Sequence, residues 1–292
     1  MSERSDSQVP LSVLVPVKNE AANLRDCLAS VSFAREIVVV DSASTDGTKA
    51  IAEAAGARVV QFVWQGSFPR KKNWALENVP WQNEWLLIID ADERITPELE
   101  REIKHAIRRS DVNGFYLNRR FWFLSGWINH CGYFPSWNLR LFRHRFGRYE
   151  QLDIDRSVVS GDNEVHEHVL LNGRAEHLSS PMEHYAFPDI ATFVEKHNRY
   201  SSWEAAASAK LHEREGEKTL RASPFGTAVE RKRWLKKVAR RTPFRPSLRF
   251  LYHYIWKQGF RDGYHGWMLC RLLAWYERMI LLKEREMKKQ RR

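Results

Sequence analysis

Three carboxylates follow a short apolar run in the first third of the chain. The run Trp85–Ile89 leads directly into Asp90, Asp92 and Glu93. It lacks polar alternation, which is typical of a buried strand. If that strand continued through Asp92, both aspartates would project from one face, as a pair suited to a divalent cation that also contacts phosphate. The alternative, a strand followed by a helix capped by Thr96, leaves the charge of Asp90 unexplained.

The segments expected to hold these carboxylates alternate between strand and helix. Residue patterns predict strands at 11–17, 36–40 and 56–60, and helices at 19–30 and 49–55. This alternation is typical of an α/β fold with a parallel sheet and right-handed crossovers. Ligands of such sheets bind at the carboxyl ends of the strands. The segments 16–20, 41–48 and 90–93 should therefore meet at one edge.

The composition is that of a globular protein, with 43% hydrophobic and 28% charged residues among 292. No apolar run is long enough to cross a bilayer, and residues 1–10 lack the apolar core of an export signal. The cysteines Cys27, Cys131 and Cys270 are far apart and match no zinc spacing. We therefore expect a protein of a reducing, cytoplasmic compartment.

Positive charge is concentrated at the C-terminal end. The net charge is +11, yet residues 230–292 alone contain 19 Lys/Arg and 5 Asp/Glu. The other residues are nearly neutral, with 28 basic and 31 acidic groups. This excess predicts an anionic partner, either membrane phospholipid or nucleic acid.

Three segments resemble one enzyme family in their order and spacing: Leu14–Glu20, Val39–Thr48 and Ile89–Glu93. The family is that of the inverting family 2 glycosyltransferases, which have the GT-A fold, a Rossmann-like mixed sheet flanked by helices. The Val165-His166-Glu167 pattern is similar to the branch of this family that acts in lipopolysaccharide core biosynthesis. No Walker or G-x-G-x-x-G loop is present, which counts against a kinase or a dehydrogenase.

The resemblance implies a UDP-sugar donor and a divalent metal, Mg²⁺ or Mn²⁺. The residues implied beside the nucleotide are Pro16, Asn19, Glu20, Asp41, Asp90 and Ala91. Asp41 would accept from the uracil N3–H, and Asp90 would lie beside the ribose. Asp92, the last residue of a DXD motif, would hold the metal against the diphosphate, where it acts as a Lewis acid on the leaving group.

Basic residues at the start of a predicted helix are further candidates for the donor. Arg70, Lys71 and Lys72 offer positive charge to a diphosphate, with Arg70 and Lys72 as the preferred contacts. The alternative is a solvated basic loop that leads into a helix around Asn73–Glu77.

An inverting transfer needs a carboxylate base near the anomeric carbon. The resemblance assigns this role to Glu167, with Glu164 as the second candidate and an exposed strand as the alternative interpretation. His184 is a further metal or diphosphate ligand, or else a structural histidine. A Gln-x-x-Arg-Trp motif is absent, which favours transfer of a single sugar over polymer synthesis.

The second half of the chain is expected to complete the fold. Alternation predicts strands at 114–123 and 138–143, with an aromatic stretch at 122–137 that is either core or a sugar platform, and a helix at 193–212. We expect a catalytic domain at 1–229, with a nucleotide-sugar half at about 10–110 and an acceptor half at 111–229. A basic, amphipathic helical region should occupy 230–292.

This basic region interleaves cations with aromatic residues, as interfacial membrane elements do. It is expected to bind an anionic membrane peripherally, on the inner face of the cell membrane. Packing on the catalytic domain is the alternative, and nucleic acid is not the expected partner. The predicted function is transfer of one sugar from a UDP-sugar to a glycolipid, lipid-linked or lipopolysaccharide-core acceptor. A polyprenyl-phosphate acceptor, or a non-catalytic nucleotide or nucleic-acid binder, are the alternatives.

Overall fold

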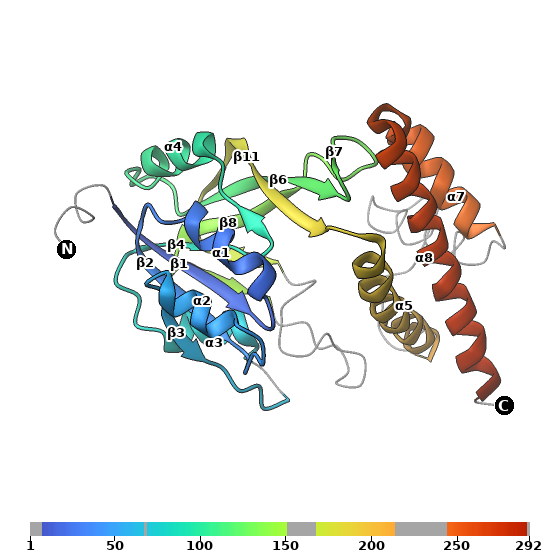
Figure 1. Cartoon of the computed structure of the whole chain (residues 1–292), viewed down its shortest axis with the longest axis horizontal. Helices are drawn as coiled ribbons and strands as arrows, with labels where there is room; N and C mark the ends of the chain where they lie inside the picture. Colours follow the sequence, from blue (N-terminus) through green and yellow to red (C-terminus); the bar gives the residue numbers. More distant parts are fainter. Residues whose placement is uncertain (1–7, 67–68, 151–167, 214–243, 291–292) are drawn as a thin grey trace. The chain divides into compact units, whose positions relative to one another are not determined.

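The computed structural model describes residues 8–66, 69–150, 168–213 and 244–290 (Figure 1). The chain forms two compact units, which we describe separately. The first comprises residues 1–122 and 133–186, and the second comprises residues 123–132 and 187–292.

The N-terminal half of the first unit contains a parallel sheet. Its strands, in spatial order, are β3 (Arg58–Gln61), β2 (Ala34–Asp41), β1 (Val9–Val17) and β4 (Trp85–Ile88). Helices α1 (Ala21–Ser30), α2 (Thr48–Ala54) and α3 (Lys71–Asn78) connect them. The register sets Val17 of β1 opposite Asp41 of β2, so the two strands end at the same edge. The predicted alternation of strand and helix is confirmed.

The sheet continues beyond β4 with mixed strand directions. The added strands are β8 (Trp137–Arg143), β6 (Gly114–Phe123), β11 (Ala175–Phe187) and β5 (Glu93–Arg94), in that spatial order. Strand β8 is antiparallel to β4 and β6, and β11 is antiparallel to β5. A separate hairpin pairs β9 (Gly147–Tyr149) with β10 (Val169–Leu171). The mixed α/β sheet flanked by helices confirms the expected fold class.

Helix α4 (Pro97–Ala106) follows β5, and the Thr96 Oγ1 atom accepts the Leu99 N–H at 3.2 Å as the predicted N-cap. The apolar strand that precedes β5 and α4 ends sooner than predicted. Strand β4 stops at Ile88, and the Glu93 N–H donates to the Asp90 carbonyl at 2.9 Å. A turn therefore separates the two aspartates, and the expectation of a strand continuing through Asp92 is wrong.

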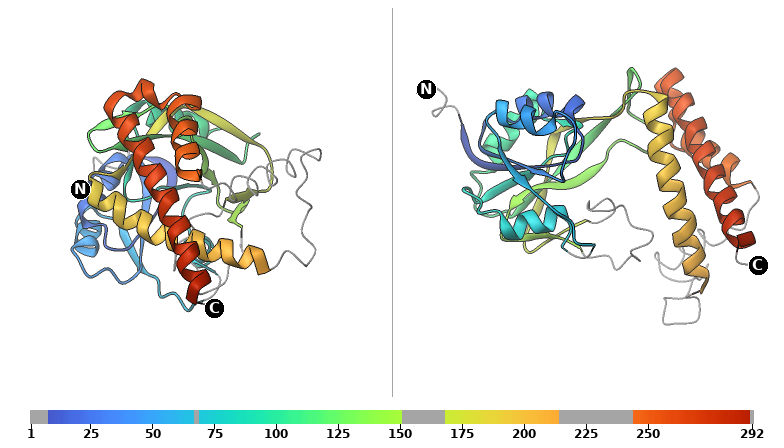
Figure 2. Two further views of the ribbon diagram at one scale, coloured as in Figure 1. Left: turned by 90° about the vertical axis from the view of Figure 1, so that its right-hand side faces the viewer. Right: turned by 60° about the horizontal axis from the view of Figure 1, so that its bottom comes forward.

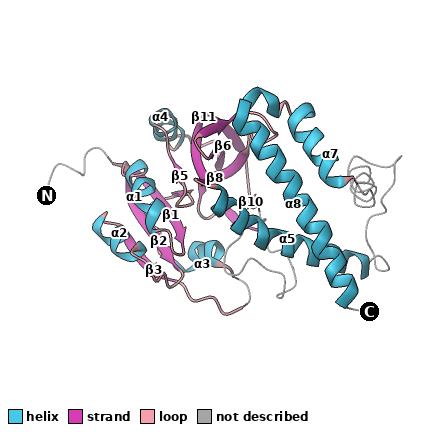
Figure 3. Ribbon diagram, turned by 45° about the vertical axis from the view of Figure 1, so that its right-hand side comes forward, coloured by secondary structure: helices cyan, strands magenta, loops and turns pink. Residues whose placement is uncertain are grey.

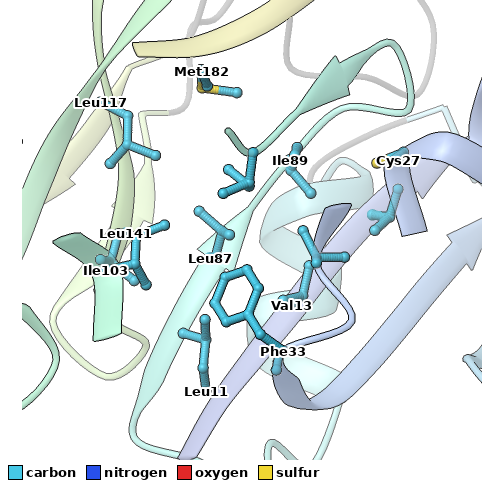
Figure 4. Close-up of a cluster of buried hydrophobic side chains, with 14 of the residues drawn as sticks. Leu11, Val13, Cys27, Phe33, Leu87, Ile89, Ile103, Leu117, Leu141 and Met182 are labelled. Carbon is cyan, nitrogen blue, oxygen red and sulfur yellow. The ribbon is translucent and has the colours of Figure 1, made fainter. Parts of the chain in front are cut away.

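Two apolar clusters cover the two faces of this sheet. Val13, Leu87 and Ile89 belong to one cluster (Figure 4). Residues of the helices α1, α2 and α4 complete this cluster. Leu86 and Ile88 point to the other face, which α3 covers. All five side chains are fully buried, and burial of each contributes roughly 1.5–3 kcal/mol. This double-sided burial explains why β4 reads as an unbroken apolar run.

The second unit contains β7 (Gly126–Ile128) and a set of helices. These are α5 (Ile190–Glu213), α7 (Arg245–Leu251), the π-helical turn η2 (Tyr252–Trp256), the 3₁₀ turn η3 (Gly259–Asp262) and α8 (Gly263–Gln290). Helix α8 packs against α5 and α7, and Figures 2 and 3 show these pairs side by side. A Cβ at Gly266 would lie 2.0 Å from the Gly259 carbonyl oxygen, so this close approach requires glycine.

The helix expected at 193–212 is confirmed as α5, and it belongs to the same unit as the C-terminal helices. The domain boundary expected after residue 229 lies outside the described residues and stays a prediction. Among the helices that the structure describes, none combines the length and the apolar character needed to span a membrane.

Candidate functional site

The loops that follow β1 and β2 are joined by side-chain hydrogen bonds. Asn19 adopts a left-handed φ of 56°, which asparagine tolerates better than most residues. Its N–H donates to Ser44 Oγ and its Oδ1 accepts the Thr45 N–H, both at 2.8 Å. The Glu20 N–H likewise donates to Thr48 Oγ1 at 2.8 Å. The two predicted segments therefore form one surface, as expected.

Asp41 lies at the end of β2 with its side chain almost completely buried. Its Oδ2 accepts from Gln61 Nε2 at 3.0 Å, and its Oδ1 accepts from the Ser44 N–H at 3.2 Å. The Ser44 hydroxyl also donates to Oδ1. Pro16, also buried, pairs with Val40 immediately before this loop. The Ser44 N–H also lies 3.3 Å from Oδ2, so three donors share the roughly four acceptor positions of this carboxylate, which leaves about one for a ligand N–H.

The basic residues at the start of α3 are buried, not solvated. Lys71 is fully buried, and its Nζ donates to the Val17 carbonyl at 2.8 Å, which ties α3 to the end of β1. Arg70 and Lys72 are only 4% and 6% exposed. Lys72 Nζ lies 3.1 Å from Asp90 Oδ1. The alternative of a solvated basic loop is therefore wrong.

Asp90 and Glu93 are held by a network of buried cations. Arg140 Nη2 lies 2.7 Å from Asp90 Oδ2 and 3.1 Å from Glu93 Oε1, and Arg119 reaches Glu93 at 3.4 Å. Glu93 Oε2 accepts the Asp90 N–H at 2.9 Å. Burial opposes ionisation of Asp90, but the charges of Arg140 and Lys72 hold its pKa well below the usual range. Asp90 is therefore ionised at neutral pH.

Asp92 has a different partner. The pairing of β11 with β5 brings His184 to it, and His184 Nε2 lies 3.4 Å from Asp92 Oδ2. The Tyr185 N–H donates to the Asp92 carbonyl at 2.8 Å, which fixes the backbone of the turn. Within the part of the chain that the structure describes, the buried His184 Nδ1 has no hydrogen-bond partner.

These two side chains fit a divalent metal. Ligand atoms 3.4 Å apart can both bind one ion at about 2.0–2.2 Å. No group of three or more His, Cys, Asp or Glu side chains able to hold a metal occurs among the described residues. Two protein ligands are enough for Mg²⁺, which keeps several waters and takes further oxygens from phosphates.

Comparison with known sequences identifies the family. The sequence profile of "Glycosyl transferase family 2" matches residues 12–162, which is just over half of the 292 residues. The chain belongs to this family. The match includes all three segments at the sheet edge, together with Arg70, Lys72 and Arg140.

Curated relatives of this glycosyltransferase agree. A glycosyltransferase of Rickettsia felis, itself uncharacterised, is 32% identical over 209 residues, which cover 67% of this chain and 69% of the relative. The lipopolysaccharide core biosynthesis glycosyltransferase LpsC of Rhizobium meliloti is 30% identical over 210 residues, 68% of this chain and 71% of LpsC.

Solved structures match this chain more weakly. Glucosyl-3-phosphoglycerate synthase from Mycobacterium tuberculosis, in complex with Mn²⁺, UDP and glucosyl-3-phosphoglycerate, has 22% sequence identity and a TM-score of 0.30. The match covers 38% of this chain and 44% of the synthase. A likeness of this size carries no argument about metal or donor.

The structure brings together most of the predicted site residues of this glycosyltransferase. Asn19 and Glu20 share hydrogen bonds with the loop after Asp41, and Lys72 contacts Asp90. The predicted base Glu167 and its alternative Glu164 lie outside the described residues, so both stay predictions.

Sequence reasoning did not identify Arg140 and Arg119 as partners of the carboxylates. It also did not predict that Glu93 would bind other groups of the protein itself. Period-two alternation in β8 placed Arg140 on its polar face, whereas the side chain is buried against two carboxylates. The available signal was one arginine between the apolar residues Leu139 and Leu141, in a chain with three carboxylates at the end of a buried strand. An isolated buried arginine requires such partners.

Proposed function

We propose that this glycosyltransferase moves a single sugar, with inversion, from a UDP-sugar to a lipid-linked or lipopolysaccharide-core acceptor at the cytoplasmic face of the membrane. The observation that supports it best is the pair of Asp92 and His184, together with the hydrogen bonds that join the loops after β1 and β2. A carboxylate–imidazole pair that fits a divalent metal suits a nucleotide diphosphate.

The nucleotide part of the donor is assigned to the loops after β1, β2 and β4. Asp41 accepts the uracil N3–H with its remaining acceptor capacity, and Pro16, Asn19 and Glu20 line the base and ribose. Asp90 and Ala91 lie beside the ribose. Because Lys72 and Arg140 already neutralise Asp90, a second carboxylate near the diphosphate adds little repulsion.

The diphosphate is assigned to Asp92, His184 and Arg70. Asp92 Oδ2 and His184 Nε2 would hold Mg²⁺ or Mn²⁺, which as a Lewis acid supports the departing UDP. Arg70 supplies a guanidinium that suits phosphate oxygens. Lys72 acts indirectly in this scheme, through its ion pair with Asp90.

The acceptor side rests on fewer observations. Glu167, or Glu164 in its place, takes the proton from the attacking hydroxyl. The name of the Rhizobium relative, which refers to lipopolysaccharide core biosynthesis, supports an acceptor of that kind. The basic C-terminal region supports peripheral association with an anionic membrane.

The donor assignment is tested by thermal denaturation with a panel of nucleotide sugars in the presence of Mn²⁺. We expect UDP-sugars to raise the melting temperature, and EDTA to remove most of that increase, because binding stabilises only the folded state. Stabilisation by a guanine or cytidine nucleotide sugar, or by none, would overturn the UDP assignment. An increase unchanged by EDTA would overturn the metal.

The catalytic base is tested by Glu167→Gln, with Glu164→Gln as the matched control. Loss of the base should reduce kcat about a hundredfold or more for a hydroxyl acceptor, while UDP binding stays unchanged. An attacking phosphate is already anionic and needs little help from a base. A fully active Glu167→Gln variant would therefore favour a polyprenyl-phosphate acceptor, and loss only in Glu164→Gln would move the base to that residue.

A further inference from the structure

Helix α7 directs its two arginines at the neighbouring helix α8. Arg245 and Arg249 face α8, where both form ion pairs with Glu277, the latter at 2.8 Å. Arg245 also lies 3.5 Å from Glu284. The Arg245 and Glu277 side chains are only 11% and 9% exposed. Because α7 packs on α8 through these ion pairs, most of its apolar residues lie on its other faces.

Those apolar residues point to the outside. The apolar stripe, as we call it, follows helical spacing and comprises Phe244, Leu248, Leu251, Tyr252 and Ile255, each 47% exposed or more. No residue of α7 or η2 is buried, and Trp256, the last residue of η2, is 78% exposed. Eight of the fourteen large exposed hydrophobic residues described lie between residues 244 and 264. Such clustering marks an interaction surface rather than scattered exposure.

Three cations without an acidic partner among the described residues accompany the stripe. Lys257, Arg261 and Arg271 are exposed, and no carboxylate of the described residues lies within 4.0 Å of them. The one acidic residue between 244 and 271 is Asp262, whose side chain is 2% exposed and bonded to His130. This face therefore presents positive charge without negative charge.

A hollow adjoins the stripe between α7 and α8. Its volume is about 490 Å³, and Phe250, Leu251, Trp267 and Arg271 are among its lining residues. The Arg271 guanidinium lies 4.7 Å from the centre of the Trp267 ring. Apolar walls beside one guanidinium suit an acyl chain attached to a phosphate.

We propose that the apolar stripe, with Trp256, Lys257 and Arg261, inserts into the headgroup region of an anionic membrane leaflet. Aliphatic side chains enter the acyl boundary, aromatic residues lie at headgroup level, and cations contact lipid phosphates. The inference deepens the proposed function by naming the surface that brings the enzyme to lipid. A second copy of this chain fits the surface less well, because a two-fold interface would bring the same cations of both copies together. Nucleic acid fits less well because leucine and isoleucine offer nothing to a base.

The test is co-sedimentation of the full chain with vesicles of phosphatidylcholine alone or with one third phosphatidylglycerol. We expect binding to the anionic vesicles that decreases with salt. Leu248→Ser should weaken it about tenfold, and K257Q/R261Q about thirtyfold. Leu282→Ser is the matched apolar control, since Leu282 is 49% and Leu248 48% exposed. K49Q/R101Q removes the same charge from exposed sites of the first unit and should leave binding unchanged.

Three outcomes would overturn the inference: no binding by the wild type, equal loss in the matched controls, or a dimer in light scattering that Leu248→Ser converts to monomer. UDP binding in solution is measured on the same variants and should not change. If the vesicle results are as expected but the protein does not bind UDP, the membrane-binding surface is supported and the proposed function is refuted.

Discussion

Replacing Asp92 by asparagine is expected to lower turnover of the UDP-sugar by about a thousandfold, as loss of a charge that stabilises a leaving group does. The change keeps the shape of the turn, because the Asp92 carbonyl still accepts the Tyr185 N–H. It removes the anionic oxygen that lies 3.4 Å from His184 Nε2. Calorimetry of Mn²⁺ binding in the presence of UDP should show the same loss, independently of turnover.

The control for this variant is Asp26→Asn, which changes an aspartate that is 74% exposed and should leave both measurements unaffected. His184→Ala should weaken Mn²⁺ binding, and the double variant should lose little more than Asp92→Asn alone, since both remove one shared site. If the Asp92→Asn variant kept the Mn²⁺ affinity and the turnover of the wild type, Asp92 would be excluded as a metal ligand.

Replacing Arg140 by methionine is expected to destabilise the fold by about 3 kcal/mol, because it removes the nearer cation of the fully buried Glu93 and leaves only Arg119, at 3.4 Å, beside it. Arg140 is 6% exposed and bonds both Asp90 and Glu93, which is fully buried. The free energy of unfolding from urea denaturation measures the loss. Arg101→Met is the matched control, since its ion pair with Glu98 is exposed and should contribute about 0–1 kcal/mol.

The pH dependence of the stability of Arg140→Met tests whether the lost ion pairs cause the destabilisation. The folded-state pKa of Asp90 is lowered, so its contribution to stability is present above the unfolded pKa of about 3.9 and is lost as the pH falls through the lowered value. The gap between wild type and Arg140→Met should therefore narrow in acid. Adding Glu93→Gln should restore part of the stability at neutral pH. A gap that is constant with pH and insensitive to Glu93→Gln would indicate lost packing instead.

The sequence was sufficient for the N-terminal, parallel half of the sheet. Apolar runs define β1, β2 and β4, and polar segments follow directly at their ends. Parallel strands must end at one edge, so the joining of Asn19 with the loop after Asp41 followed from local pattern alone. The cap at Thr96 was equally predictable, because a cap depends on residues within a single turn.

What the sequence left undecided depends on contacts between distant residues. Asp90 and Asp92 look like one pair, but Arg140 takes the first and His184 the second, each from a strand placed by sheet order. The basic, aromatic C-terminal region suggested a membrane element without saying which face of α7 it would use. Glu277 on α8 decides that, since it draws Arg245 and Arg249 inward and leaves the apolar stripe outside. Periodicity fixes which residues share a face; only the partner helix fixes where that face points.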